Sequence, residues 1–236
     1  MKKGKIYLIP TTLGGLDEPE KVLPDYNIKI VHQLDEFIVE QLRTARRFLS
    51  KIAHPLPIDQ LKFHELNKHT HSNEISGYLT PVVKGKSIGL LSEAGTPCVA
   101  DPGAVIVQMA HELGIEVVPL VGPNSIILAL MASGFNGQHF TFHGYLPVDK
   151  QALLKKIRDI ELASRESKQT QIFIETPYRN NQLLAKLFEV CKSDTKICIA
   201  TNLTMESESI KTKRIHEWKK ETVDLHKKPT VFLLYF

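Results

Sequence analysis

Short apolar runs alternate with amphipathic segments through the first half of the chain. Runs rich in β-branched residues predict strands, and they show little alternation of apolar and polar positions, as expected for a sheet covered on both faces. The predicted strands are 6–9, 28–31, 61–64, 87–91 and 116–120. Apolar residues at steps of three and four predict helices over 38–52 and 105–113, with Gly114 ending the second. Strands and helices in this order predict an α/β fold with a largely parallel sheet.

The second half has a different pattern. Residues 125–133 are apolar nearly all round, which predicts a helix buried between two layers. Strands are expected at 140–146, 171–175, 196–201, 208–214 and 230–236, with helices near 150–162 and 183–191. The last three strands have almost no helix between them, so we expect them to pair antiparallel. The chain therefore predicts two α/β domains, 1–120 with a mainly parallel sheet and 121–236 with a mixed one.

Composition narrows the class of protein without indicating a function. The chain has 236 residues, of which 42% are hydrophobic and 24% charged, and a formal net charge of +4. These are values of an ordinary globular protein, so collagen, coiled coil and disorder are excluded. No apolar run approaches the ~18–20 residues that a membrane helix needs. Cys98, Cys191 and Cys198 form no C-x-x-C pair and no secretory signal is recognisable, so we expect a cytoplasmic protein.

Three loops rich in glycine and proline each follow a predicted strand, at 10–15, 92–103 and 121–126. In an open α/β sheet, ligands bind beyond the carboxyl ends of the strands, where glycine lets the backbone approach a ligand and proline fixes a turn. One such loop more often simply ends a strand, but three together predict a binding site. Neither Gly14-Gly15 nor Gly85-Lys86-Ser87 has the spacing and position of a nucleotide-binding loop, which disfavours NAD and ATP.

Two other groups of residues leave alternatives open. His64, His69 and His71 could bind a metal, but without cysteines or an H-E-x-x-H helix they fit strand-end and loop positions better. Two basic groups are ordinary solvated faces or sites for a phosphate backbone. They are Arg43, Arg46, Arg47 and Lys51 in the first half, and Lys155, Lys156 and Arg158 in the second.

Taken in order, the three loops resemble the tetrapyrrole methylase superfamily of S-adenosylmethionine-dependent methyltransferases. The longest match is S-E-A-G-T-P-C-V-A-D-P-G at 92–103, similar to that family's S-D-A-G-T-P-x-I-S-D-P-G. Shorter matches are I-P-T-T-L-G-G-L-D at 9–17, V-V-P-L-V-G-P-N-S at 117–125, A-S-G-F at 132–135, H-G-Y-L-P at 143–147 and E-T-P-Y-R at 175–179. Among its branches the chain most resembles the ribosomal RNA small-subunit methyltransferase I family, whose members methylate a ribose 2′-hydroxyl.

The resemblance implies two α/β domains with S-adenosylmethionine in the cleft between them, no metal, and a homodimer. The residues that it implies for the methyl donor are Pro10, Leu13, Gly95, Thr96, Val99, Ser125, Ile126, Leu203, Pro229 and Thr230. A ribose hydroxyl is a weak nucleophile, so a base or polarising group is expected beside it. The candidates are Glu40, Arg43, His64, Asn67, Glu175 and Arg179. Glu175 and Arg179 could equally form a structural pair across a helix start.

Positions on the substrate side depart from the family pattern more than the cofactor loops do. The family's A-E-D-T-R is V-E-Q-L-R here, with Gln41 in place of the aspartate, and its R-E-L-T-K is T-N-L-T-M at 201–205. Methyl transfer to RNA is the leading hypothesis. The alternatives are methylation of a small molecule such as a corrin or porphyrin, and a cofactor-binding protein without activity.

Overall fold

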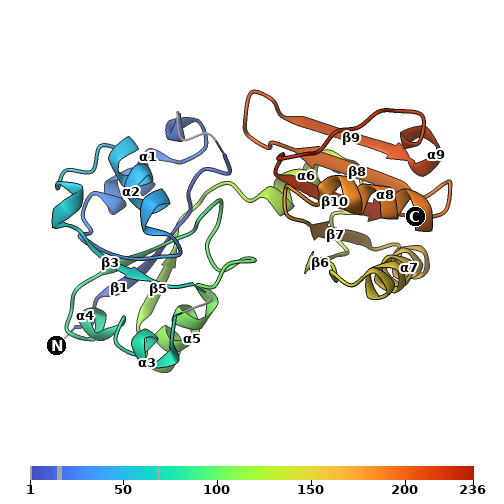
Figure 1. Cartoon of the computed structure of the whole chain (residues 1–236). Coiled ribbons are helices and arrows are strands. Elements are labelled where there is room, and N and C mark those ends of the chain that lie inside the picture. The colour runs from blue at the N-terminus through green and yellow to red at the C-terminus, as the bar shows by residue number, and fades with distance from the viewer. Residues whose placement is uncertain (1, 15–17, 68–69) are drawn as a thin grey trace. The chain divides into compact units, whose positions relative to one another are not determined.

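The computed structural model describes residues 2–14, 18–67 and 70–236 (Figure 1). Its internal contacts divide the chain into two compact units, Met1–Asn124 and Ser125–Phe236. The division falls four residues after the boundary predicted at residue 120. Each unit is built on its own five-stranded sheet, so the two are described separately.

Unit 1 has the parallel sheet that the sequence predicts. Its strands are β1 (Lys5–Ile9), β2 (Glu36–Val39), β3 (Lys62–Glu65), β4 (Ile88–Leu91) and β5 (Glu116–Pro119). They lie in the order β3-β2-β4-β1-β5, and every pair is parallel. All four residues of β2 and of β4 are buried, because helices cover both faces of the sheet. All five strands therefore end at the same edge.

The helices of unit 1 form two layers. Helices α1 (Asp25–Val31) and α2 (Leu42–Lys51) lie on one side of the sheet, while α3 (Ser72–Ile75), α4 (Thr80–Val83) and α5 (Ala104–Glu112) lie on the other (Figure 1). Two short 3-10 helices, Pro19–Lys21 and Ile58–Gln60, complete the unit. Phe37, Phe48 and Leu49 belong to the core under α1 and α2, and Leu79, Ile88 and Ile106 to the core on the opposite face.

Two of the predicted elements in unit 1 are wrong. Residues 28–31 belong to α1 and not to a strand, because Asn27, Ile30 and Val31 bury one helical face in the core. The helix predicted over 38–52 begins only at Leu42, since Ile38 lies in β2. The apolar spacing continues by chance across the turn at Glu40-Gln41. Because of this spacing, the sequence pattern did not reveal β2, a strand whose four residues are all buried.

Unit 2 has the mixed sheet that the sequence predicts, in the order β6-β7-β10-β8-β9. Only β6 and β7 are parallel, and the remaining pairs are antiparallel. The strands are β6 (Phe140–Tyr145), β7 (Thr170–Ile174), β8 (Lys196–Thr201), β9 (Ser209–Arg214) and β10 (Thr230–Tyr235). The helices are α6 (Ser125–Ser133), α7 (Lys150–Ser167), α8 (Asn180–Val190) and α9 (Ile215–Trp218).

The core of unit 2 lies between the sheet and α7 and α8, with Phe173, Phe232 and Ile157 fully buried. Helix α6 packs against β9 and β10, where Thr212 Oγ1 donates to the Ser133 carbonyl at 2.8 Å. Within α6, Ile126, Ala129, Leu130 and Ser133 are buried, whereas Met131 remains 74% exposed. In unit 2, α6 therefore has one buried side and one open side.

Candidate functional site

The three loops found in the sequence are joined by hydrogen bonds at the carboxyl edge of the unit 1 sheet. Thr11 N–H donates to the Gly95 carbonyl at 2.9 Å, which connects the first loop to the second. Asn124 Nδ2 donates to Thr96 Oγ1 at 2.7 Å, which connects the third loop to the second. The structure therefore brings together three segments that are up to 114 residues apart, taking Pro10 and Asn124 as the ends.

Gly95 lies where the three loops meet. Its φ of +73° is in the left-handed region that glycine adopts without strain. A Cβ atom at this position would lie 2.8 Å from Leu13 Cδ2 and 3.0 Å from the Pro123 carbonyl oxygen. At Gly122, a Cβ would overlap the Pro10 ring. The close approach of the loops thus depends on the absence of side chains at two glycines.

The second loop is held by its own aspartate. Asp101 Oδ1 accepts from the backbone N–H of Cys98 at 3.0 Å and of Gly103 at 2.8 Å. Cys98 and Ala100 have φ values of 68° and 55°, a backbone conformation that residues with a Cβ rarely adopt and that clusters at functional sites. Burial, with the nearby Asp101 charge, raises the pKa of the Cys98 thiol to about 11. The thiol therefore stays protonated at neutral pH and does not act as a nucleophile.

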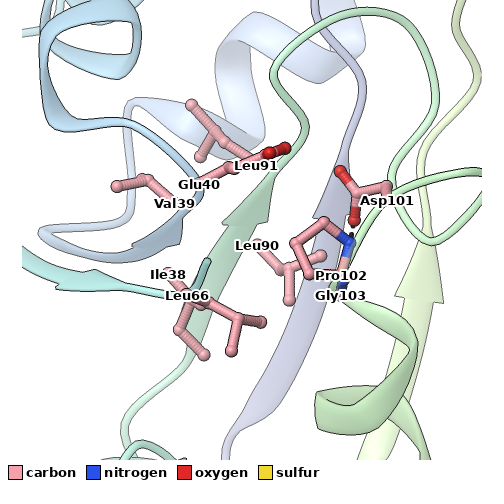
Figure 2. Close-up of a pocket in the computed structure, with 9 residues that line it drawn as sticks. All are labelled: Ile38, Val39, Glu40, Leu66, Leu90, Leu91, Asp101, Pro102 and Gly103. Atoms are coloured by element: carbon pink, nitrogen blue, oxygen red, sulfur yellow. Dashed lines mark hydrogen bonds between the residues drawn. The ribbon is translucent and has the colours of Figure 1, made fainter. Parts of the chain in front are cut away.

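A small, open hollow lies beside this loop, at the carboxyl ends of β2 and β4 (Figure 2). Its lining residues are Ile38, Val39, Glu40, Leu66, Leu90, Leu91, Asp101, Pro102 and Gly103. Figure 2 shows the carboxylates of Glu40 and Asp101 at one end and the side chains of Ile38 and Leu66 at the other. The hollow thus has apolar walls and an acidic end.

Glu40 has the electrostatic character of a group that takes up a proton. Burial raises the pKa of its carboxyl above the usual range, and the charges of Asp101 and Glu93 raise it further. A carboxylate with a raised pKa is a better base, which fits the role expected for Glu40. Arg43, also expected at the acceptor, lies in the first turn of α2, and its side chain is exposed.

His64, the third residue of β3, belongs to another cluster, which forms around Glu36. Its Nε2 lies 2.8 Å from Glu36 Oε1, and its ring lies 4.9 Å from the Tyr78 ring between centroids. Lys86 Nζ lies 2.8 Å from the other oxygen of Glu36. Glu36 is the first residue of β2, and Lys86 precedes β4, so this cluster and Glu40 are at different ends of β2. The backbone N–H of Asn67 donates to Thr70 Oγ1 at 2.9 Å.

The remaining donor residues expected in unit 1 lie on the joined loops. Pro10 is buried, Leu13 and Thr96 are half-buried, and Val99 presents an exposed apolar side chain. The first loop is described only as far as Gly14, and His69 also lies outside the described residues. Where the chain is described, no three His, Cys, Asp or Glu side chains are placed to hold a metal ion.

The donor residues expected in unit 2 are in two places. Ser125 and Ile126 open α6. Leu203, Pro229 and Thr230 lie at one edge of the sheet, where Thr230 pairs in register with Thr201 and Asn202 N–H donates to the Pro229 carbonyl at 3.0 Å. Asn202, Thr204 and Lys227 all have positive φ. This edge therefore has tightly constrained backbone on both sides of Pro229.

Glu175 and Arg179 lie at the same edge of unit 2, after β7. Arg179 Nη2 lies 3.0 Å from Glu175 Oε2, and the other oxygen of Glu175 accepts the Thr176 N–H at 2.7 Å. The glutamate side chain is buried. The pair across the start of α8 is thus present, which supports the structural alternative that the sequence left open for these two residues.

Two buried asparagines support these loops and were missed in the sequence. Asn27 Nδ2 donates to the Val121 carbonyl in the third loop at 2.7 Å. Asn180 Nδ2 donates to the Lys228 carbonyl at 2.7 Å and to Thr230 Oγ1 at 3.1 Å. The Asn180 Oδ1 atom is buried and has no hydrogen-bond partner among the described residues. Asn180 follows E-T-P-Y-R directly, which is the only local signal for it.

No helix in the described part of the chain is long and apolar enough to cross a bilayer. A likeness to known proteins covers nearly the whole chain. The chain is 30% identical to the ribosomal RNA small subunit methyltransferase I of Vibrio cholerae over 205 residues, which are 87% of this chain and 67% of that protein. It is 33% identical to the Bacillus subtilis protein of the same name, covering 87% of this chain and 65% of that one. It thus spans about two thirds of the length of these relatives.

A solved structure and a family model agree with this likeness. The crystal structure of the methyltransferase CobJ superposes with a TM-score of 0.66 at 16% identity, covering 98% of this chain and 94% of that one, which shows the fold alone. The model of the tetrapyrrole (corrin/porphyrin) methylases matches residues 28–218. The family expected from the loop motifs is therefore confirmed. The chain belongs to the tetrapyrrole methylases, a family of methyltransferases that use S-adenosyl-L-methionine.

Proposed function

We propose that this protein transfers a methyl group from S-adenosylmethionine to a ribose 2′-hydroxyl of small-subunit ribosomal RNA. The observation that carries the proposal is the joining of the three loops around Gly95, beside the hollow that contains Glu40. The relatives from Vibrio cholerae and Bacillus subtilis are both named ribosomal RNA small subunit methyltransferase I. The loops support the methyl donor, and the names of the relatives support ribosomal RNA as the acceptor.

The residues of the joined loops fit the methyl donor. A sulfonium ligand with an adenosine end needs backbone polar groups, small residues and aliphatic walls. Pro10, Leu13, Gly95, Thr96 and Val99 supply these in unit 1. In unit 2 we assign Ser125, Ile126, Leu203, Pro229 and Thr230 to the donor, as the resemblance implies. The bound donor supplies an electrophilic methyl group.

The chain's own contribution to the reaction is orientation and removal of one proton. In-line displacement gains most from holding the nucleophile and the methyl group in line, which rigid loops favour. We assign to Glu40 the uptake of the proton from the ribose hydroxyl, because burial and two neighbouring carboxylates make its carboxylate more basic. Arg43, in the first turn of α2, is the cation that we place nearest to the acceptor's phosphates.

Calorimetry and acceptor assays test the proposal together. We expect the purified protein to bind S-adenosylmethionine and to methylate small-subunit ribosomal RNA, with no turnover of corrin or porphyrin precursors. Absence of heat at millimolar donor would remove the methyltransferase assignment. Donor binding with turnover of a tetrapyrrole, and none of RNA, would instead favour the small-molecule alternative.

We propose further that the protein works as a homodimer in the cytoplasm and that its two units are its domains. The homodimer follows from the resemblance, and the domain division is supported by the contacts that separate Met1–Asn124 from Ser125–Phe236. Light scattering on the eluted protein should give about twice the 26.6 kDa of one chain. A mass of one chain at micromolar concentration would contradict the dimer.

A further inference from the structure

Helix α2 carries four cations and no acid. Arg43, Arg46, Arg47 and Lys51 are all exposed, and the ten residues of the helix include neither aspartate nor glutamate. None of the ion pairs in the described part of the chain involves these four residues. The helix therefore presents positive charge that forms no ion pair with the side chains described in its own unit.

The four cations share one side of α2, which we call the α2 basic face. At about 100° per residue they fall within an arc of about 140°. The buried residues Ala45, Phe48 and Leu49 lie on the opposite side and anchor the helix in the core. Arg47 and Lys51 are ~6 Å apart along the axis. A row of charges at this interval suits the repeating phosphates of a nucleic acid strand.

One cation of this face is held in place by an aromatic ring. The Arg46 guanidinium carbon lies 5.6 Å from the centre of the Phe63 ring. The Phe63 ring is only half-buried, and its other neighbour is the Phe37 ring, at 6.1 Å between centroids. A planar guanidinium stacked on an aromatic ring is ordered before binding and still offers its N–H groups to a phosphate.

The position of the α2 basic face connects it to the proposed reaction. Helix α2 begins at Leu42, two residues after Glu40 in the hollow, so Arg43 is the cation closest in sequence to the proposed base. The face then runs along the helix away from that edge of the sheet. The acid of the neighbouring 3-10 helix is Asp59, which forms no ion pair among the described residues.

We propose that the α2 basic face binds the phosphate backbone of the RNA acceptor and leads the strand toward Glu40. The inference rests on the proposed function and names a surface that the donor loops do not include. A positively charged face fits a polyanion as its partner. Because the face begins beside the proposed base, we identify this polyanion as the RNA acceptor.

Filter binding to small-subunit ribosomal RNA at several salt concentrations tests this surface. The test variant is Arg46→Gln/Arg47→Gln/Lys51→Gln, which keeps good helix formers and leaves Arg43 in place. Its matched control is Lys155→Gln/Lys156→Gln/Arg158→Gln in α7, which removes the same charge from a helix that also contains Asp159, Glu161 and Glu166. Melting curves and donor calorimetry show whether each variant is folded.

We expect the α2 variant to bind RNA at least 10-fold more weakly, with a salt slope smaller by about 2, since each single-strand phosphate contact contributes ~0.7. Its donor affinity should equal that of the wild type, and the α7 control should bind RNA normally. An equal loss of RNA affinity in both variants, or no loss in the α2 variant, would contradict the proposed role of the α2 basic face. Neither result would contradict RNA methylation by the wild type. A wild type that binds no RNA would overturn both the surface and the proposed acceptor. Binding to vesicles of anionic lipid is measured in parallel. If the α2 variant loses vesicle binding but keeps normal RNA binding, the α2 basic face would be a membrane-binding surface instead.

Discussion

Gly95 shows how one residue controls the meeting of three loops. The backbone there is left-handed, and Leu13 and Pro123 fill the space that a side chain would need. Gly134 has nearly the same φ, +74°, but nothing lies within 4 Å of its added Cβ. A substitution at Gly134 therefore measures only the cost of the backbone conformation, about 1–2 kcal/mol for an L-residue. A substitution at Gly95 adds the cost of pushing the loops apart.

Gly95→Ala should weaken donor binding at least 10-fold, because Leu13 or the Pro123 backbone must move to admit the methyl group. Gly134→Ala should lower the melting temperature, because it carries a similar cost for a left-handed backbone, but it should leave donor affinity unchanged. Calorimetry with S-adenosylmethionine measures both. Equal donor affinity in the two variants would show that the packing around Gly95 does not form the donor site.

The carboxyl of Glu40, proposed as the base, also lowers the stability of the native state when it is ionised. Its raised pKa means that folding favours the protonated carboxyl, so the ionised form destabilises the native state at neutral pH. Glu40→Gln should therefore raise the melting temperature at pH 7–8. That gain should vanish as the pH falls below the ordinary carboxyl pKa of about 4.3. Thermal melts across pH check this sign, and a gain that grows toward acid would contradict it.

The same substitution should lower kcat by about 100-fold, within the range for loss of a general base. Glu93→Gln, on the neighbouring loop, should keep kcat but move the acid limb of the rate profile to lower pH, because the Glu93 charge helps to raise the pKa of Glu40. Rate profiles over pH measure both effects. Unchanged kcat in Glu40→Gln would remove Glu40 from the reaction.

At the scale of elements, the amino ends of β2 and β4 are joined by ion pairs around Glu36. Burial raises the pKa of this carboxyl, but the hydrogen bonds and charges of Lys86 and His64 outweigh it and hold the pKa below its usual range. The stability that this gives is present above the ordinary carboxyl pKa and is lost as the pH falls through the lowered value. The cluster thus supports unit 1 near neutrality.

Lys86→Met should destabilise the protein by about 2 kcal/mol at pH 7, because it leaves the buried Glu36 with one partner fewer. Denaturant titration at pH 7 and at pH 3 measures the difference between variant and wild type, which should shrink at pH 3 where Glu36 is protonated in the unfolded chain. An equal difference in unfolding free energy at the two pH values would mean that the loss of stability in Lys86→Met does not come from Glu36.

The elements that local pattern determines were predictable, and those that depend on tertiary packing were not. Helix α6 has the predicted bounds, 125–133, because an apolar helix after Pro123-Asn124 and before Gly134 has clear ends. Strand β2 was hidden since its apolar residues continue the spacing of α2. The β-branched residues of 28–31 form a helix because Asn27, Ile30 and Val31 reach the core only from a helical backbone.

The candidate site divides in the same way. The three loops could be found from Gly, Pro and their positions after strands, which are local features. The roles of Asn27 and Asn180 could not, because each asparagine donates to a carbonyl that is at least 48 residues away in the chain. The cluster around His64 could not be predicted for a similar reason, since its acid comes from β2 and its lysine from the segment before β4.

At the scale of the whole molecule, each unit presents constrained backbone at one edge of its sheet. In unit 1 the joined loops lie around Gly95, and in unit 2 the segments near Leu203 and Pro229 contain three residues with positive φ. The residues assigned to the donor occur in both sets. Under the proposed function, rigid segments of this kind would hold the methyl donor in the geometry that in-line transfer requires.

The most direct measurement is mass spectrometry of small-subunit ribosomal RNA after incubation with the protein and S-adenosylmethionine labelled in its methyl group. The RNA comes from cells that lack the gene, so that the acceptor is unmodified, and Gly95→Ala serves as the control. We predict one labelled nucleotide, with the label on the ribose 2′-oxygen, and much less label with the variant when the donor is below saturation. Label on a base, or an unlabelled RNA with the wild type, would contradict the proposed function.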